Sequence, residues 1–231
     1  MGLLQSISAY KANIAFTKRN YDKALKLYDK ITSKANVNPA ILIKYAYVAI
    51  YLGKLDLCKE VLDKVNYDGL DNDILLNSYK QTEGLYVWKN GNIEEAIEIY
   101  KDLHNRYRNT SIYETLGYLL IVNENYTEAL KYNLEAYDYN SDNNVIADNL
   151  AETYYYLKQP GKAKEIYVKI HEAEPTKQPK FAEAYYYYGL ILKLEGKIDK
   201  AKEMLERALT MRESYLSILS KKDIEEELNL L

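Results

Sequence analysis

Apolar residues recur three and four positions apart along most of the 231-residue chain, and short polar breaks separate the runs. One run carries Leu116, Leu119, Leu120 and Val122. This spacing places the apolar side chains on one face of an α-helix and does not fit the alternation of a strand. The pattern therefore predicts an all-α protein of antiparallel helix pairs. The breaks hold residue types that suit a helix C-terminus and a tight turn, namely Gly53, Gly91, Asn125, Gly161 and Gly196.

Small residues recur with a longer period. One lies near the start of each of six similar segments, at successive spacings of 34, 38, 33, 34 and 38 residues, and another precedes each by 12 positions. Small side chains at both places let the two helices of a pair approach closely, so we read the chain as six helix pairs. The first set is Ala24, Cys58, Ala96, Ala129, Ala163 and Ala201, and the second is Ala12, Ala46, Gly84, Gly117, Ala151 and Gly189.

The fourth and sixth segments carry the fullest sets of recurring side chains. They are Tyr113, Leu116, Gly117, Leu120, Tyr126, Ala129 and Ala136 in the fourth, and Tyr185, Tyr188, Gly189, Gly196, Ala201 and Ala208 in the sixth. In these residues the chain resembles the tetratricopeptide-repeat family. The resemblance covers roughly residues 5–211. It implies a right-handed superhelical solenoid of six helix–turn–helix repeats that ends in a capping helix.

We expect a single array without a separate second domain. The predicted repeats span approximately residues 5–38, 39–72, 73–109, 110–143, 144–178 and 179–212, and the predicted capping helix spans residues 213–231. The two spacings of 38 residues indicate two insertions of about four residues each. We place them in longer helices or loops near residues 65–76 and 173–184.

Four consecutive tyrosines, Tyr185–Tyr188, point to all sides of a predicted helix. The resemblance implies that the first helix of each repeat lines a concave groove, so we expect Tyr185 and Tyr188 to face the core and Tyr186 and Tyr187 to face the groove. Tyrosine and tryptophan offer a large contact area with one polar tip, which suits peptide recognition. The predicted peptide-binding residues are Asn13, Tyr47, Tyr51, Trp88, Tyr118, Asp148, Glu152, Tyr155, Tyr186 and Tyr187. The alternative is that the rings only line the inner wall.

Acidic residues refine the expected partner. Glu114, Asp148, Glu152 and Glu183 follow the C-terminal half of the predicted wall. An aromatic and acidic groove favours a segment that combines basic and apolar residues. We therefore predict a non-catalytic scaffold that binds an extended or helical segment of another protein.

A second hypothesis is an assembly element that associates with itself through its terminal helices. The apolar residues Leu228, Leu230 and Leu231 exceed what one capping helix needs. This excess favours a weak homodimer through the C-terminal helix.

Composition argues against other functions. The formal net charge of −3 provides no basic face for nucleic acid, and no stretch approaches the ~18 apolar residues of a membrane span. The single cysteine, Cys58, excludes an intramolecular disulfide and a thiolate zinc site and indicates a reducing, cytoplasmic location. His104 and His171 lie in different repeats, and the sequence has no phosphate-binding loop or nucleophile elbow. We expect no metal, no cofactor and no enzymatic activity.

Overall fold

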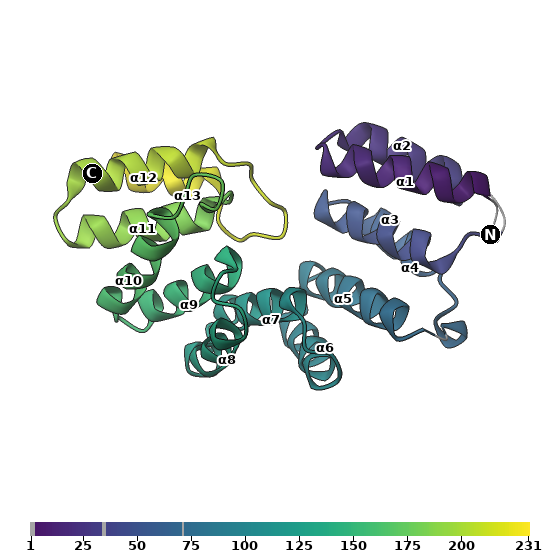
Figure 1. The fold of residues 1–231 in the computed structure, drawn as a ribbon, viewed down its shortest axis with the longest axis horizontal. Helices are drawn as coiled ribbons and strands as arrows, with labels where there is room; N and C mark the ends of the chain where they lie inside the picture. Colours follow the sequence, from purple (N-terminus) through teal and green to yellow (C-terminus); the bar gives the residue numbers. More distant parts are fainter. Residues whose placement is uncertain (1–2, 34–35, 71) are drawn as a thin grey trace. The chain divides into compact units, whose positions relative to one another are not determined.

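A computed structural model describes residues 3–33, 36–70 and 72–231, and every regular element in these residues is helical (Figure 1). The all-α prediction is thereby confirmed for this part of the chain. The chain divides into two compact units, where the sequence analysis expected one array. Unit 1 is Met1–Ile99 and unit 2 is Tyr100–Leu231.

Unit 1 contains two antiparallel helix pairs and a long fifth helix. Helix α1 packs on α2 and α3 packs on α4, while α3 also lies beside α5. The first predicted insertion is a loop between α4 and α5 that contains a 3₁₀ turn, Tyr67–Gly69. The helices are α1 (Leu3–Thr17), α2 (Tyr21–Thr32), α3 (Pro39–Tyr51), α4 (Leu55–Leu62) and α5 (Asp73–Lys89), and α6 (Ile93–Arg106) crosses into unit 2.

Unit 2 continues the same pattern. The first helices α7, α9 and α11 lie side by side, and each packs against the helix that follows it. The second predicted insertion is the loop over residues 172–181. The helices are α7 (Thr110–Val122), α8 (Tyr126–Tyr139), α9 (Asn144–Tyr156), α10 (Pro160–His171), α11 (Ala182–Leu194), α12 (Ile198–Thr210) and α13 (Lys221–Asn229).

Short polar residues set the helix starts. The side chains of Asn38, Asn109 and Asn143 accept hydrogen bonds from the first backbone amides of α3, α7 and α9. Each such cap stabilises a helix by about 1 kcal/mol. Of the predicted breaks, Gly161 is wrong because it lies inside α10, and the left-handed turn residue before that helix is Lys158, with φ of 60°.

The small residues do bring paired helices together. All nine non-glycine members of the two sets are 0% exposed. At Gly189 on α11, a Cβ atom would lie 3.0 Å from Cγ of Leu205 on α12. At Gly117 on α7, a Cβ atom would lie 2.0 Å from Oδ1 of Asn133 on α8. A larger side chain at either glycine would push the helices apart.

The capping helix is shorter than predicted. It begins at Lys221, not at residue 213, because Ser220 and Asp223 form a capping box in which each side chain binds the other residue's backbone amide. The segment from Met211 to Ser220 is non-helical. We call residues 211–231 the C-terminal arm.

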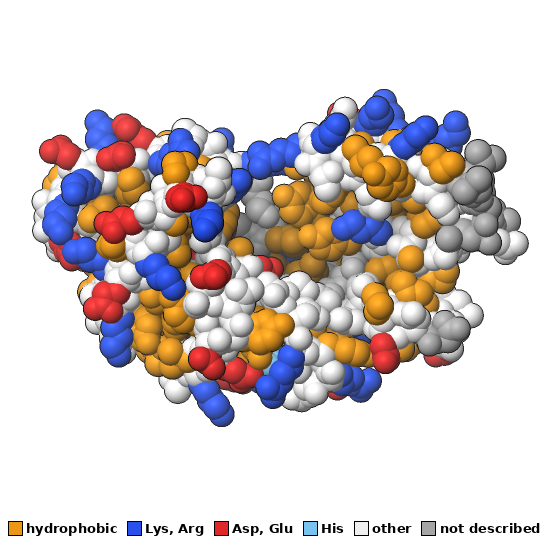
Figure 2. All heavy atoms as spheres, in the orientation of Figure 1, with side chains coloured by type: hydrophobic (Ala, Val, Ile, Leu, Met, Phe, Trp, Pro, Cys, Tyr) orange, Lys and Arg blue, Asp and Glu red, His pale blue; other side chains and the backbone are white. Residues whose placement is uncertain are grey.

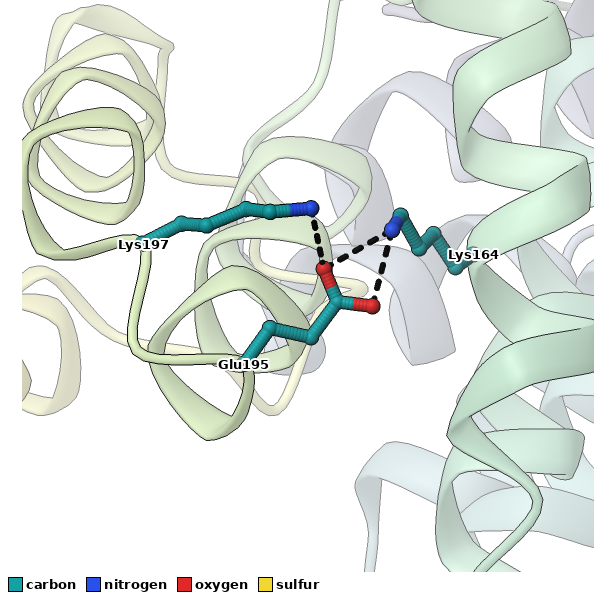
Figure 3. Close-up of polar contacts among 3 residues, drawn as sticks. All are labelled: Lys164, Glu195 and Lys197. Carbon is teal, nitrogen blue, oxygen red and sulfur yellow. Dashed lines mark hydrogen bonds and ion pairs between the residues drawn. The ribbon is translucent and has the colours of Figure 1, made fainter.

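An ion-pair cluster links two helix pairs of unit 2. The Glu195 carboxylate follows α11 and accepts hydrogen bonds from Lys164 on α10, at 2.8 Å, and from Lys197, at 2.7 Å (Figure 3). These hydrogen bonds lower the pKa of Glu195. The cluster is partly exposed, so it contributes little to stability.

Candidate functional site

The first helices of each unit present a surface turned away from the second helices, and we call it the first-helix face of that unit. In unit 1 three aromatic side chains of α1 and α3 at this face contact one another, together with a fourth from the first residue of α2. The Phe16 ring centroid lies 5.6 Å from that of Tyr21, 6.3 Å from that of Tyr47 and 5.2 Å from that of Tyr51. All four side chains are half-buried, so each retains surface in contact with solvent. We call them the aromatic cluster.

Lysines accompany the aromatic side chains of unit 1. Lys44 Nζ lies 4.5 Å from the Tyr47 ring centroid and 5.6 Å from that of Phe16. Lys89 Nζ lies 3.9 Å from the Trp88 ring centroid. Such contacts attract a cation to the face of an aromatic ring. Burial lowers the pKa of Lys44, and it lowers the pKa of Lys89 to about 8. Figure 2 shows hydrophobic side chains gathered over α3, with Lys or Arg side chains among them.

Two predicted residues of unit 1 do not line an open groove. Asn13 uses its amide oxygen to accept a hydrogen bond from the Tyr28 hydroxyl, so its side chain joins α1 to α2. Trp88 is only 7% exposed because α5 packs it into the unit. The other two predicted residues, Tyr47 and Tyr51, lie in the aromatic cluster and retain exposed surface.

In unit 2 two of the four residues of the predicted acidic wall, Asp148 and Glu152, are interior, while Glu114 and Glu183 are half-buried. Residues Ile146–Thr153 of α9 are all buried because α7 and α11 flank this helix while α8 and α10 pack behind it. Asp148 is 3% exposed and Glu152 is 1% exposed, so the prediction that they meet a partner in an open groove is wrong. Asp148 instead accepts a hydrogen bond of 3.0 Å from the Tyr167 hydroxyl.

Burial controls the protonation of these acids. Desolvation raises the pKa of Asp148 well above its ordinary value, and the nearby Glu152 and Glu183 carboxyls add to the effect. Desolvation also raises the pKa of Glu152 to about 8, against a lowering effect of a hydrogen bond with Tyr187. Both buried carboxyls therefore favour the protonated, neutral form, and neither offers a fixed negative charge to a basic peptide.

The four consecutive tyrosines are all used within unit 2. Tyr185 is buried, as predicted, and donates to the Pro179 carbonyl at 3.1 Å. Tyr188 is half-buried and stacks on His171, with ring centroids 5.1 Å apart. The prediction for Tyr187 is wrong, because its ring is 6% exposed and its hydroxyl lies 2.8 Å from that of Tyr156.

The remaining predicted residues of unit 2 meet the C-terminal arm. The Tyr118 hydroxyl accepts a hydrogen bond of 3.0 Å from the backbone amide of Ile218. Tyr186 packs in the apolar cluster that includes Ile224, and the Glu227 carboxylate helps to raise the pKa of both Tyr155 and Tyr186 after burial, which is the larger cause. The chain itself therefore covers part of the first-helix face of unit 2.

A buried polar network in unit 2 was not predicted. The Asn133 amide of α8 donates to the Thr153 hydroxyl of α9 at 3.1 Å, and Asn149 donates to the Glu114 carbonyl of α7 at 2.8 Å. Asn133 is 0% exposed, and Gly117 leaves the space for its amide oxygen. The sequence signal for this network was Gly117 followed by an asparagine sixteen positions later, Asn133.

The cysteine and one histidine considered as possible catalytic or metal-binding groups, Cys58 and His104, pack against other side chains. Cys58 is fully buried, which raises the pKa of its thiol to about 12. The His104 ring packs against Tyr113 and Tyr132, and burial lowers its pKa. Within the described residues, no three His, Cys, Asp or Glu side chains gather to hold a metal ion. The helices of the same residues include none long and apolar enough to cross a membrane.

Comparison with known proteins finds relatives that contain helical repeats. A tetratricopeptide-repeat model matches residues 182–215, and a model of the TT21 fifth ARM repeats domain matches residues 8–116. A TPR repeat-containing protein of Methanocaldococcus jannaschii is 29% identical over 147 residues, or 64% of this chain. The chain is therefore similar to proteins of the tetratricopeptide-repeat family. It covers 25% of that relative's length.

Solved structures are similar to this chain in fold. PilF of Pseudomonas aeruginosa is similar with a TM-score of 0.65 and 14% identity, over 96% of this chain and 97% of PilF. YrrB, described as a TPR protein with an unusual peptide-binding site, is similar with a TM-score of 0.50 and 18% identity, over 79% of this chain and 90% of YrrB. At these identities the likeness shows the fold alone, which is a helical repeat architecture.

Proposed function

We propose that the chain is a non-catalytic scaffold that binds a segment of a partner protein on the first-helix face of unit 1. The observation that carries the proposal is the aromatic cluster, in which Phe16, Tyr47 and Tyr51 stay half-exposed. Large aromatic rings that are clustered and partly exposed are typical of protein-binding surfaces. The peptide-binding site named for the fold relative YrrB supports the same mode of use.

The charges around the cluster favour an acidic partner segment. The expectation of a basic segment rested on Glu114, Asp148, Glu152 and Glu183, and two of these, Asp148 and Glu152, are buried. Lys44 and Lys89 accompany the aromatic side chains of unit 1. We therefore propose a segment in which Asp or Glu stands beside apolar residues, with the carboxylate near Lys44 and the apolar side chains on the cluster.

Self-association through the C-terminal helix has less support. Leu228 and Leu231 pack against an apolar cluster that α11, α12 and α13 share, so they are not available in excess. Leu230 alone of the three leucines is exposed, at 69%. One exposed leucine is ordinary for a protein surface.

A peptide-display screen against the full chain tests the proposal. Selected peptides are measured by fluorescence anisotropy against the wild type, the double variant Tyr47→Ala/Tyr51→Ala and the control Tyr139→Ala, which removes a 49% exposed tyrosine of unit 2. We expect the double variant to bind at least tenfold more weakly and the control to bind as the wild type does. Equal binding to all three proteins would remove the aromatic cluster from the proposed function.

A charge variant tests the chemistry of the segment. Replacing Lys44 by Glu should weaken acidic peptides and leave neutral ones nearly unchanged, because the substitution reverses one charge beside the cluster. The matched control is Lys26→Glu, at an exposed lysine of α2. Selection of basic peptides that Lys44→Glu binds more tightly would contradict the acidic-segment proposal.

A further inference from the structure

The C-terminal arm does more than cap the last helix pair. After α12 ends at Thr210, the chain stays non-helical for ten residues, visible in Figure 1 as the loop between α12 and α13. In this stretch the Ile218 amide donates to the Tyr118 hydroxyl on α7, one hundred residues earlier in the chain. A cap on α11 and α12 alone would not need to reach α7.

The second half of the arm returns to the end of the unit. Ile224 of α13 is 1% exposed and packs with Tyr185 and Leu205. Leu219 and Leu228 of the arm pack at the edge of the same apolar cluster. The arm is therefore anchored at two places, by one backbone hydrogen bond on α7 and by an apolar contact on α11 and α12.

Charge complementarity accompanies the apolar contact. Glu227 of α13 forms an ion pair of 2.9 Å with Lys193 of α11, and both side chains are about a quarter exposed. The Glu183 carboxyl of α11 also lies near this face, whereas Asp148 and Glu152 are buried and favour the neutral form. An acidic helix is held there because its carboxylate meets Lys193 at the edge of that face.

We infer that the first-helix face of unit 2 is a recognition surface that the C-terminal arm occupies in cis, and that it binds a partner segment of the arm's chemistry when the arm is released. That segment is a short extended aliphatic stretch followed by an acidic amphipathic helix. The extended part offers a backbone N–H to the Tyr118 hydroxyl, and the helix offers a carboxylate to Lys193 and an aliphatic side chain to the Ile224 position. Covalent attachment gives the arm a high effective concentration, so it excludes such a partner while it stays docked.

The test uses the full chain with its arm released. Ile224→Asp places a charge where the arm is buried and changes no residue of unit 2 outside the arm. The probe is a fluorescein-labelled peptide of residues 211–231. We expect Ile224→Asp to bind it at least tenfold more tightly than the wild type, whose own arm competes. The matched control, Leu230→Asp, makes the same change at a 69% exposed position of the arm and should behave as the wild type. If the arm of Ile224→Asp is released and the protein still does not bind the labelled peptide, the inference is overturned.

Peptide variants test the proposed contacts. A peptide with Ile218→Pro lacks the N–H that Tyr118 accepts, and a peptide with Glu227→Lys lacks the carboxylate that Lys193 meets. Each should bind Ile224→Asp at least fivefold more weakly than the unmodified peptide. A control peptide with Glu225→Lys, at an exposed position of α13, should bind nearly as well. Equal binding of all four peptides would show that the first-helix face of unit 2 recognises neither the Ile218 N–H nor the Glu227 carboxylate.

Amide hydrogen exchange of the unmodified chain provides a measurement that needs no variant. We expect the Ile218 amide to exchange at least tenfold more slowly than in the isolated peptide, because it donates to Tyr118. Exchange at the rate of the isolated peptide would overturn the inference, since the arm would not lie on the face in solution.

Discussion

In unit 1, four aromatic rings at the first-helix face remain half-exposed beside Lys44, whereas in unit 2 the corresponding face buries Tyr187, Asp148 and Glu152 and carries the C-terminal arm. Both faces come from the same repeat, with tyrosines at similar helical positions. The difference lies in what covers them. In unit 2, α9 has a first helix on each side and two second helices behind it, and the arm crosses the same face.

The comparison teaches that a tyrosine at a first-helix position is not by itself a binding residue. Tyr51 contacts Phe16 and Tyr47 and keeps part of its ring in solvent, while the Tyr187 hydroxyl lies 2.8 Å from that of Tyr156 and its ring is nearly fully buried. Hydroxyl partners allow tyrosine to be buried without an unsatisfied polar group. Unit 2 uses its tyrosines for internal packing, and unit 1 retains them at its surface.

The largest effect that separates the units is expected from Glu152→Gln at high pH. The pKa of Glu152 is 4.5 in its ordinary state and about 8 in the folded chain because of burial. Between these values the folded chain holds one proton more than the unfolded chain, so the free energy of unfolding decreases as pH rises from 4.5 to 8 and stays low above 8. Glutamine is neutral at every pH. We expect Glu152→Gln to stabilise unit 2 by roughly 3 kcal/mol at pH 9 and by little at pH 5.

The measurement is amide hydrogen exchange of α9 at both pH values, corrected for the intrinsic exchange rate. The groups that face Glu152 are Asp148 on the same helix, Tyr118 on α7, and Glu183 and Tyr187 on α11. The control is Glu206→Gln, at an exposed position of α12. A pH-independent effect of Glu152→Gln would mean that the carboxyl is ionised in the folded chain.

Unit 1 should respond to pH in the opposite direction. Burial lowers the pKa of Lys89 to about 8 from its ordinary 10.5, so between these values the unfolded chain holds one proton more than the folded chain. The free energy of unfolding of unit 1 therefore increases as pH rises from 8 to 10.5. Trp88, the single tryptophan of the chain, reports on this unit by fluorescence during urea unfolding. Urea midpoints that decrease over this range would contradict the expectation.

A substitution of intermediate effect is Gly117→Ala in unit 2. The added Cβ would lie 2.0 Å from the Asn133 amide oxygen, which is buried among α7, α8 and α9. We expect a loss of about 2 kcal/mol of stability, measured as a lower urea midpoint by circular dichroism. Gly161→Ala in α10 is the matched control, because its Cβ would meet nothing within 4 Å and should change stability by less than about 1 kcal/mol. Equal effects of the two substitutions would show that the buried polar network rearranges around the added Cβ atom without loss of stability.

Local features of the fold were predictable from the sequence, but the burial of the candidate site residues was not. The small residues, exemplified by Ala24 and Ala129, each lie 12 positions after a second small residue because every helix pair needs the same close approach. The late start of α13 also had a sequence signal, since Ser220 and Asp223 have the spacing of a capping box. In contrast, burial of Asp148 depends on the Tyr167 hydroxyl, and periodicity does not report such a pairing between neighbouring helices.

The smallest expected effect concerns ion pairs, which also differ between the units. In unit 1, Lys59 and Asp63 pair within one helix, whereas in unit 2 Glu195 joins α10 to the turn after α11 through Lys164 (Figure 3). We expect Glu195→Ala to lower the melting temperature of the chain by roughly 2 °C at low salt, and Asp63→Ala to lower it by less, because only the first change removes a contact between helix pairs. Both effects should vanish in about 0.5 M NaCl, because the Debye length at that salt concentration is only a few ångströms. The pKa of Glu195 is lowered by the two lysines, so its contribution should also disappear as pH falls below its ordinary value of 4.5. Differential scanning calorimetry at two salt concentrations measures these shifts, and an effect of Glu195→Ala that persists at high salt would indicate that packing, not charge, joins the two helix pairs.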